Sequence, residues 1–164
     1  MAGSSMRSGS GILLLFDISQ VATCQCTMCR KFTGALLSFD LLIHPSQLTD
    51  DITKSSTYKE FKSSEAATRS FCSSCGSSLA WRIDGMDDMM VIFLGTIDEE
   101  FLIGNKIKGT EQETGLGVRF DRQGGFSKGL CKPNMGNLFW NNAIAGITDH
   151  DLGGTKFLQS FPQQ

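Results

Sequence analysis

Cysteines are the residues of this sequence whose spacing points most directly to chemistry. Cys24, Cys26 and Cys29 form a Cys-x-Cys-x-x-Cys triplet, and Cys72 and Cys75 form a Cys-x-x-Cys pair. A Cys-x-x-Cys turn presents two sulfurs on one side of a tight loop, and zinc prefers thiolate ligands in a tetrahedral array. Three thiols within six residues can hold one ion from one face and leave the other face open. The sequence therefore predicts a zinc protein with these five candidate ligands.

Other uses of the cysteines stay open. The Cys72–Cys75 pair could be a redox dithiol, although such motifs usually accompany a βαβ pattern that is not visible here. The two groups could instead serve a purely structural zinc without chemistry. A disulfide framework is disfavoured, because Cys24 and Cys26 are too close in sequence to bridge without strain. The sixth cysteine, Cys131, is expected to be a small buried residue.

Composition and charge exclude several function classes. The 164 residues, 40% of them apolar, suit a single domain with an ordinary core. Fifteen basic and seventeen acidic residues leave a net charge of -2, which gives no electrostatic footprint for nucleic acid or an anionic membrane. The longest apolar run, residues 12–16, is far shorter than the roughly 20 residues that span a bilayer. Residues 1–11 make a poor signal peptide, so we expect a cytoplasmic protein.

Strands are the elements predicted to position the cysteines. A buried strand is expected over residues 11–18, directly before the triplet, and another over residues 36–43, where Asp40 interrupts an apolar run. Residues 68–71 and 79–83 are predicted to form a hairpin with the Cys72–Cys75 pair at its tip. Further strands are expected at residues 56–61 and 89–94.

The predicted fold class is all-β. Eighteen glycines and regularly spaced turns favour it over a helical fold. We expect residues 1–10 to be disordered and residues 11–164 to form a single zinc-binding domain. Beyond residue 104 the pattern is weak, and residues 138–140 and 143–145 are expected to be core segments.

Three segments together resemble the family of glutathione-dependent formaldehyde-activating enzymes, which includes centromere protein V. They are CQCTMCRKFTG at residues 24–34, RSFCSSCGSSL at residues 69–79 and LGTID at residues 94–98. The resemblance covers roughly residues 20–100. It implies a mainly β fold of the Mss4-like type, with sheets folded around zinc sites.

The resemblance also implies roles for the cysteines. Cys24, Cys26 and Cys29 would hold a catalytic zinc, while Cys72 and Cys75 would supply half of a structural zinc site. In the family the other half comes from a Cys-x-Cys upstream of the triplet.

That upstream motif is missing here, because residues 1–23 contain no cysteine. We expect an N-terminus that is truncated or mis-spliced. The alternatives are that the second site is lost, or that Cys131 or a histidine completes it.

The activity implied by the resemblance is that of a carbon–sulfur lyase. Such an enzyme joins formaldehyde to a small thiol such as glutathione, giving S-hydroxymethylglutathione. Arg30 and Lys31 are candidates to offset the negative charge of the thiolates, and His44 and His150 are possible bases or ligands. The alternative function is a non-catalytic zinc-binding module that binds another protein. No oligomeric state follows from the sequence.

Overall fold

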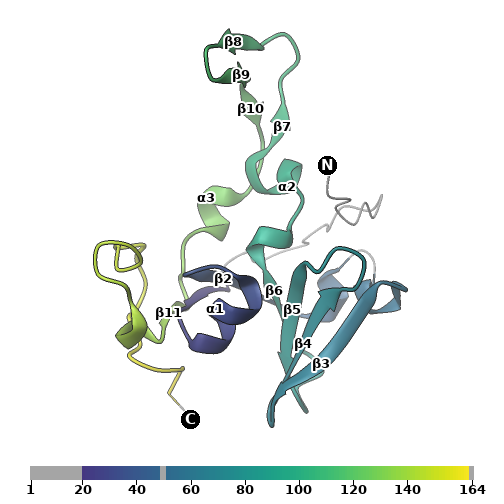
Figure 1. Cartoon of the computed structure of the whole chain (residues 1–164), viewed down its shortest axis with the longest axis vertical. Coiled ribbons are helices and arrows are strands. Elements are labelled where there is room, and N and C mark those ends of the chain that lie inside the picture. Colours follow the sequence, from purple (N-terminus) through teal and green to yellow (C-terminus); the bar gives the residue numbers. More distant parts are fainter. Residues whose placement is uncertain (1–19, 49–50, 163–164) are drawn as a thin grey trace.

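A computed structural model of the chain describes residues 20–48 and 51–162. Its largest element is a seven-stranded sheet made of β1 (Val21–Cys24), β2 (Ser38–Ile43), β3 (Tyr58–Ser64), β4 (Ala67–Cys72), β5 (Ser78–Ile83), β6 (Met90–Phe93) and β11 (Gly136–Leu138). The strand order is β11-β1-β2-β6-β5-β4-β3 (Figure 1). Neighbouring strands are antiparallel except β1 and β11, which pair in parallel.

The remaining elements are short. The helices are α1 (Thr27–Thr33), α2 (Glu99–Ile103) and α3 (Ser127–Leu130), with single 3-10 turns at η1 (Pro45–Gln47), η2 (Ile52–Lys54), η3 (Leu94–Thr96) and η4 (Trp140–Asn142). Two small sheets pair β7 (Asn105–Lys106) with β10 (Arg122–Gln123), and β8 (Gln112–Thr114) with β9 (Gly117–Arg119). The fold is mainly β, as predicted. In the part of the chain that is described, no helix is long and apolar enough to cross a membrane.

The strand predictions hold for the central sheet. Strands β2 to β6 lie where the sequence predicts them, with small shifts at their ends, and the Cys72–Cys75 pair lies at the turn between β4 and β5. The predicted disorder over residues 1–10 and strand over residues 11–18 fall outside the described residues. The strand that leads into the triplet is β1, which the sequence did not reveal.

The two faces of the main sheet are covered differently. Side chains alternate along a strand, so one face carries the main apolar core and the other faces α1. The core residues are Val21, Leu41, Ile43, Cys72, Leu79, Ala80, Met90, Ile92, Leu94, Ile97 and Leu130. On the other face, Phe32 of α1 packs its ring against Phe61 and Phe93, with ring centroids 5.7 and 5.6 Å away.

An arm formed by residues 105–123 extends away from the sheet (Figure 1). Leu116 at its far turn is fully exposed, and Phe120 is contacted by the cations of Lys106 and Arg122. The base of the arm requires a glycine, because a Cβ added to Gly104 would lie 2.4 Å from the carbonyl oxygen of Gln123. Backbone pairing and cation–π contacts, rather than a buried core, therefore hold the arm together.

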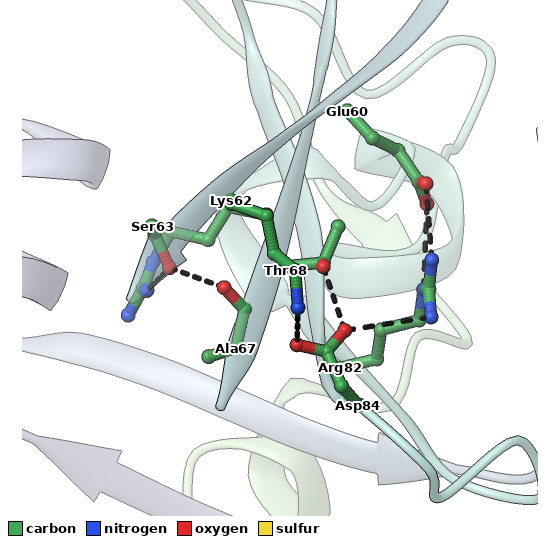
Figure 2. A network of polar contacts seen from close by, with 8 residues as sticks. Glu60, Lys62, Ser63, Ala67, Thr68, Arg82 and Asp84 are labelled. Atoms are coloured by element: carbon green, nitrogen blue, oxygen red, sulfur yellow. Dashed lines mark hydrogen bonds and ion pairs between the residues drawn. The ribbon is translucent and has the colours of Figure 1, made fainter. Parts of the chain in front are cut away.

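The outer end of the β3–β5 region carries a polar network (Figure 2). Arg82 lies 3.1 Å from Glu60 and 3.8 Å from Asp84, which also pairs with Lys62 and accepts a 2.8 Å hydrogen bond from the Thr68 hydroxyl. Because these charges are exposed to solvent, which screens them, the ion pairs contribute little to stability.

Candidate metal centre

The triplet lies where a strand passes into a helix. Cys24 is the last residue of β1, Cys26 is the N-cap of α1, and Cys29 follows in its first turn. The Cys26 sulfur accepts a hydrogen bond of 3.3 Å from the Cys29 backbone N–H, which satisfies one of the unpaired donors at the helix start. Gly34 ends α1 with φ of 71°, a left-handed conformation that glycine adopts without strain.

The fold brings the three sulfurs of the triplet together. All lie within 4.8 Å of one another. Zinc–sulfur bonds of about 2.3 Å in a tetrahedral array place sulfurs about 3.8 Å apart, so the group fits one metal ion after small side-chain adjustments. Cys24 and Cys29 are buried, whereas Cys26 is half-buried and nearest to solvent. Three ligands leave one tetrahedral position for a further ligand.

Hydrogen bonds within the triplet shift the pKa values of its thiols in opposite directions. The Cys24 and Cys29 thiols donate toward Cys26 and lower the pKa of the Cys26 thiol, while the same sharing raises that of Cys24. A cation also reaches the group, because Nη2 of Arg69 donates to the Cys29 sulfur at 3.7 Å. Asp40 is buried nearby on β2, and burial raises the pKa of its carboxyl to about 6.

Buried polar contacts tie the triplet to the C-terminal part of the chain. Gln25, fully buried between two of the cysteines, accepts 2.6 Å and 3.0 Å hydrogen bonds from Thr148 and Arg30. Arg30 also donates to the carbonyls of Leu36 and Asn142. Arg30 therefore braces the loop through neutral acceptors, and Lys31 is exposed. The guanidinium that contacts a sulfur is that of Arg69, not one of the two cations expected from the sequence.

Aromatic side chains from the end of the chain line the triplet. Phe139, Phe157 and Phe161 pack against the cluster of Cys24, Cys29 and Leu138. Phe139 has φ of 55°, which is a genuine outlier for a bulky residue. Backbone pairing holds it there, since its N–H donates to the Gln159 carbonyl at 2.9 Å. The apolar wall of the site thus depends on a strained residue far from the cysteines in sequence.

The Cys72–Cys75 pair lies in a different setting. Cys72 is buried in the main core and Cys75 is exposed. The backbone N–H groups of Cys75 and Ser74 donate to the Cys72 sulfur and lower the pKa of its thiol. Gly76 follows with φ of 77°. Within residues 20–48 and 51–162, the pair joins no third cysteine, histidine or carboxylate in a ligand group.

The other candidates for ligands do not join either group in the described residues. Cys131 was expected to be buried, and this is wrong, because it is exposed at the end of α3 while its neighbour Leu130 takes the fully buried position. His44 is exposed and caps η1, accepting a 3.1 Å hydrogen bond from the Ser46 N–H, and His150 is also exposed. Neither histidine therefore supplies a base at the triplet.

Sequence reasoning missed the polar residues behind the triplet and its aromatic wall. A charged residue inside the apolar run of residues 36–43 was the available signal for Asp40, since buried strands rarely carry one. Arg69 had no comparable signal, because β4 shows no clear apolar alternation, and the phenylalanines lie in irregular segments that carry no periodic pattern.

Comparison with known proteins agrees with this geometry. A sequence model of the glutathione-dependent formaldehyde-activating enzyme family matches residues 14–112, more than half of the chain. The match includes both cysteine groups and Arg69, while the aromatic wall lies beyond it. No curated protein matches the chain. The chain therefore belongs to the glutathione-dependent formaldehyde-activating enzyme family.

Proposed function

We propose that this protein is a zinc-dependent carbon–sulfur lyase that forms or cleaves the adduct between a glutathione-like thiol and formaldehyde or another small aldehyde. The observation that carries the proposal is the group of three sulfurs within 4.8 Å, inside the segment that matches the family. We assign Cys24, Cys26 and Cys29 as the zinc ligands at which the reaction takes place. A reducing compartment such as the cytoplasm suits such ligands, because they must remain thiolates.

The reaction is an addition and needs no oxidant or reductant. A bond forms between the thiol sulfur and the aldehyde carbon, the carbonyl π bond opens, and the thiol proton passes to the oxygen. Cys24, Cys26 and Cys29 would hold the zinc ion, which would leave a fourth ligand position for an incoming thiol and would favour loss of the thiol proton. Positioning that sulfur beside the aldehyde lowers the entropic part of the barrier.

The three cysteines of the triplet differ in their exposure to solvent. Cys24 and Cys29 are buried against the sheet and the phenylalanines, so water is excluded from that side. Cys26 is half-buried, so a small thiol would approach the centre from its side. We further assign Cys72 and Cys75 as half of a second, structural zinc site, because a turn with backbone donors aimed at a thiolate suits a metal ligand.

Metal content and exchange kinetics test the proposal. The expected result is at least one zinc per chain, together with faster exchange between free formaldehyde and S-hydroxymethylglutathione, followed by NMR with ¹³C-labelled formaldehyde. Cys26→Ser should remove the acceleration while keeping the fold, because serine is itself a good N-cap. Cys131→Ser is the matched control, since this cysteine is exposed and outside both groups. If the zinc-loaded protein leaves exchange at the uncatalysed rate for a panel of thiols and aldehydes, the proposed enzymatic activity is refuted.

The alternative is a zinc-binding module that binds another protein. The observation favouring it is the exposed arm of residues 105–123, which carries a fully exposed Leu116 at its tip. Cobalt substitution separates the two functions. A visible spectrum that changes when a small thiol is added shows an open coordination position and supports the enzyme, whereas an unresponsive spectrum supports the module.

A further inference from the structure

Arg69 occupies an unusual position for a cation. It lies in the middle of β4, is only 6% exposed, and faces the α1 side of the sheet opposite Trp81 of β5 and Phe61 of β3. Its Nη2 donates to the Cys29 sulfur at 3.7 Å, within the range for a hydrogen bond to sulfur. A buried guanidinium thus contacts one member of the triplet directly.

Three groups hold the guanidinium in place. Nη1 donates a hydrogen bond to the hydroxyl of Ser63, which itself donates to the Ala67 carbonyl at 3.0 Å. The guanidinium carbon lies 5.7 Å from the ring centroid of Phe32 and 5.9 Å from that of Trp81. Figure 2 shows Ser63 and Ala67 facing each other at the end of the β3–β4 hairpin. Because these contacts restrict the planar group, its direction toward Cys29 is fixed before anything binds.

Arg69 is in no ion pair with a carboxylate in the described residues, and the buried Asp40 carboxyl interacts with it only at longer range. Within residues 20–48 and 51–162, its Nε also has no hydrogen-bond partner. Burying a cation without an opposite charge nearby is strongly unfavourable. The negatively charged group that the guanidinium contacts directly is the thiolate group, since a divalent ion with three thiolates carries one net negative charge. The guanidinium and a metal-loaded triplet therefore neutralise each other.

We propose that Arg69 is a positioning residue of the metal centre, which orients the Cys29 sulfur and offsets the excess negative charge of the three thiolates. The inference rests on the proposed function, because it presumes that the triplet holds a divalent metal. Outer partners of this kind tune how strongly a ligand donates to its metal. The positive charge of Arg69 would also offset the charge of a fourth thiolate, which would otherwise weaken metal binding.

The experiment compares Arg69→Gln with Arg82→Gln as the matched control. Arg82 lies on the neighbouring strand but on the opposite face, where it pairs with Glu60 and Asp84 (Figure 2). The measurements are the dissociation constants of Co²⁺ and Zn²⁺ by competition with a chelator, and the sulfur-to-cobalt charge-transfer band. Arg69→Gln should weaken metal binding about 10- to 100-fold and move the band to lower energy. Arg82→Gln should change neither.

Further variants separate charge from folding. Arg69→Lys keeps the charge without the planar fork and should recover most of the affinity. If Arg69→Gln does not fold, Ser63→Ala replaces it, because that change releases the guanidinium from its tether. An unchanged charge-transfer band in a folded Arg69→Gln or in Ser63→Ala overturns the inference. A wild-type protein that binds no cobalt refutes the proposed metal centre itself. If the wild type binds cobalt and Arg69→Gln changes neither the affinity nor the charge-transfer band, only the role of Arg69 is refuted.

Discussion

The two cysteine groups of this protein show how similar spacings lead to different sites. Both contain a Cys-x-x-Cys step and a left-handed glycine further along the chain, Gly34 at the end of α1 for the triplet and Gly76 directly after the pair. The triplet, however, gathers three sulfurs within 4.8 Å, while the pair has no third partner in the described residues. Local sequence sets the backbone conformation around each group, but the number of ligands depends on what the rest of the fold brings close.

The largest expected difference between the groups is in metal binding. Cys26→Ser should weaken zinc binding by about 100-fold or more, because two cysteines hold zinc far less firmly than three. Cys75→Ser should leave the triplet occupied, since the pair is not part of that group. Zinc per chain after dialysis against a weak chelator measures both. Equal metal loss in the two variants would contradict separate sites.

On the triplet side of the sheet, the titration of Asp40 should make the free energy of unfolding depend on pH. Burial raises the pKa of Asp40 to about 6 in the folded protein, against about 3.9 in an unfolded chain. The folded state therefore holds a proton between these values that the unfolded state has lost, so stability falls as pH rises from about 4 to 6, by about 3 kcal/mol. Asp40→Asn should abolish this fall and be more stable than wild type above pH 7.

Urea unfolding of both proteins at pH 5 and 7.5, in the same metal state, checks this result. Parallel behaviour of wild type and Asp40→Asn across the two pH values would show that Asp40 does not titrate in this range.

Truncation of the pair should affect stability rather than the metal centre. Cys72→Ala should lower the free energy of unfolding by about 1–2 kcal/mol, because it removes a buried sulfur from the main core. Cys75→Ala should cost less than about 0.5 kcal/mol, because the side chain is exposed. Chemical denaturation of metal-free samples gives both values. A larger loss for Cys75→Ala would indicate that the pair has a partner holding it.

The last expected effect concerns the turn after the pair. Gly76→Ala should cost about 1 kcal/mol, because an L-residue is strained at φ of 77° even though no atom lies within 4 Å of the added Cβ. Zinc affinity at the triplet should not change. Thermal unfolding with a zinc titration tests both points, and a weakened triplet would show that the two groups are coupled.

The sequence predicted the strands around the cysteines better than the surroundings of the metal centre. Strands such as β5 and β6 are short apolar runs between turn residues, a pattern that can be recognised from neighbouring residues alone. Helix α1 was missed because it has seven residues and starts at a cysteine N-cap, which is not a usual start signal. The triplet itself was identified as a candidate ligand set. The pair was expected to lack its upstream partners, and the alternative that Cys131 or a histidine completes it finds no such group in the described residues.

Arg69 and Phe139 show why the rest was not predictable. Arg69 alternates with threonine and serine along β4, so no contrast in hydrophobicity marks it as buried. Phe139 reaches the triplet only through the parallel pairing of β1 with β11 and a left-handed backbone conformation. Contacts between segments more than 100 residues apart leave no local pattern.

The parallel pairing of β1 with β11 also has a consequence during protein synthesis. Val21–Cys24 emerges from the ribosome more than 100 residues before its partner Gly136–Leu138 and the phenylalanines beyond it. Until translation passes those codons, the nascent chain presents an unpaired strand edge next to unshielded thiols. Oxidants and adventitious metals can therefore reach these cysteines before the aromatic wall closes over them.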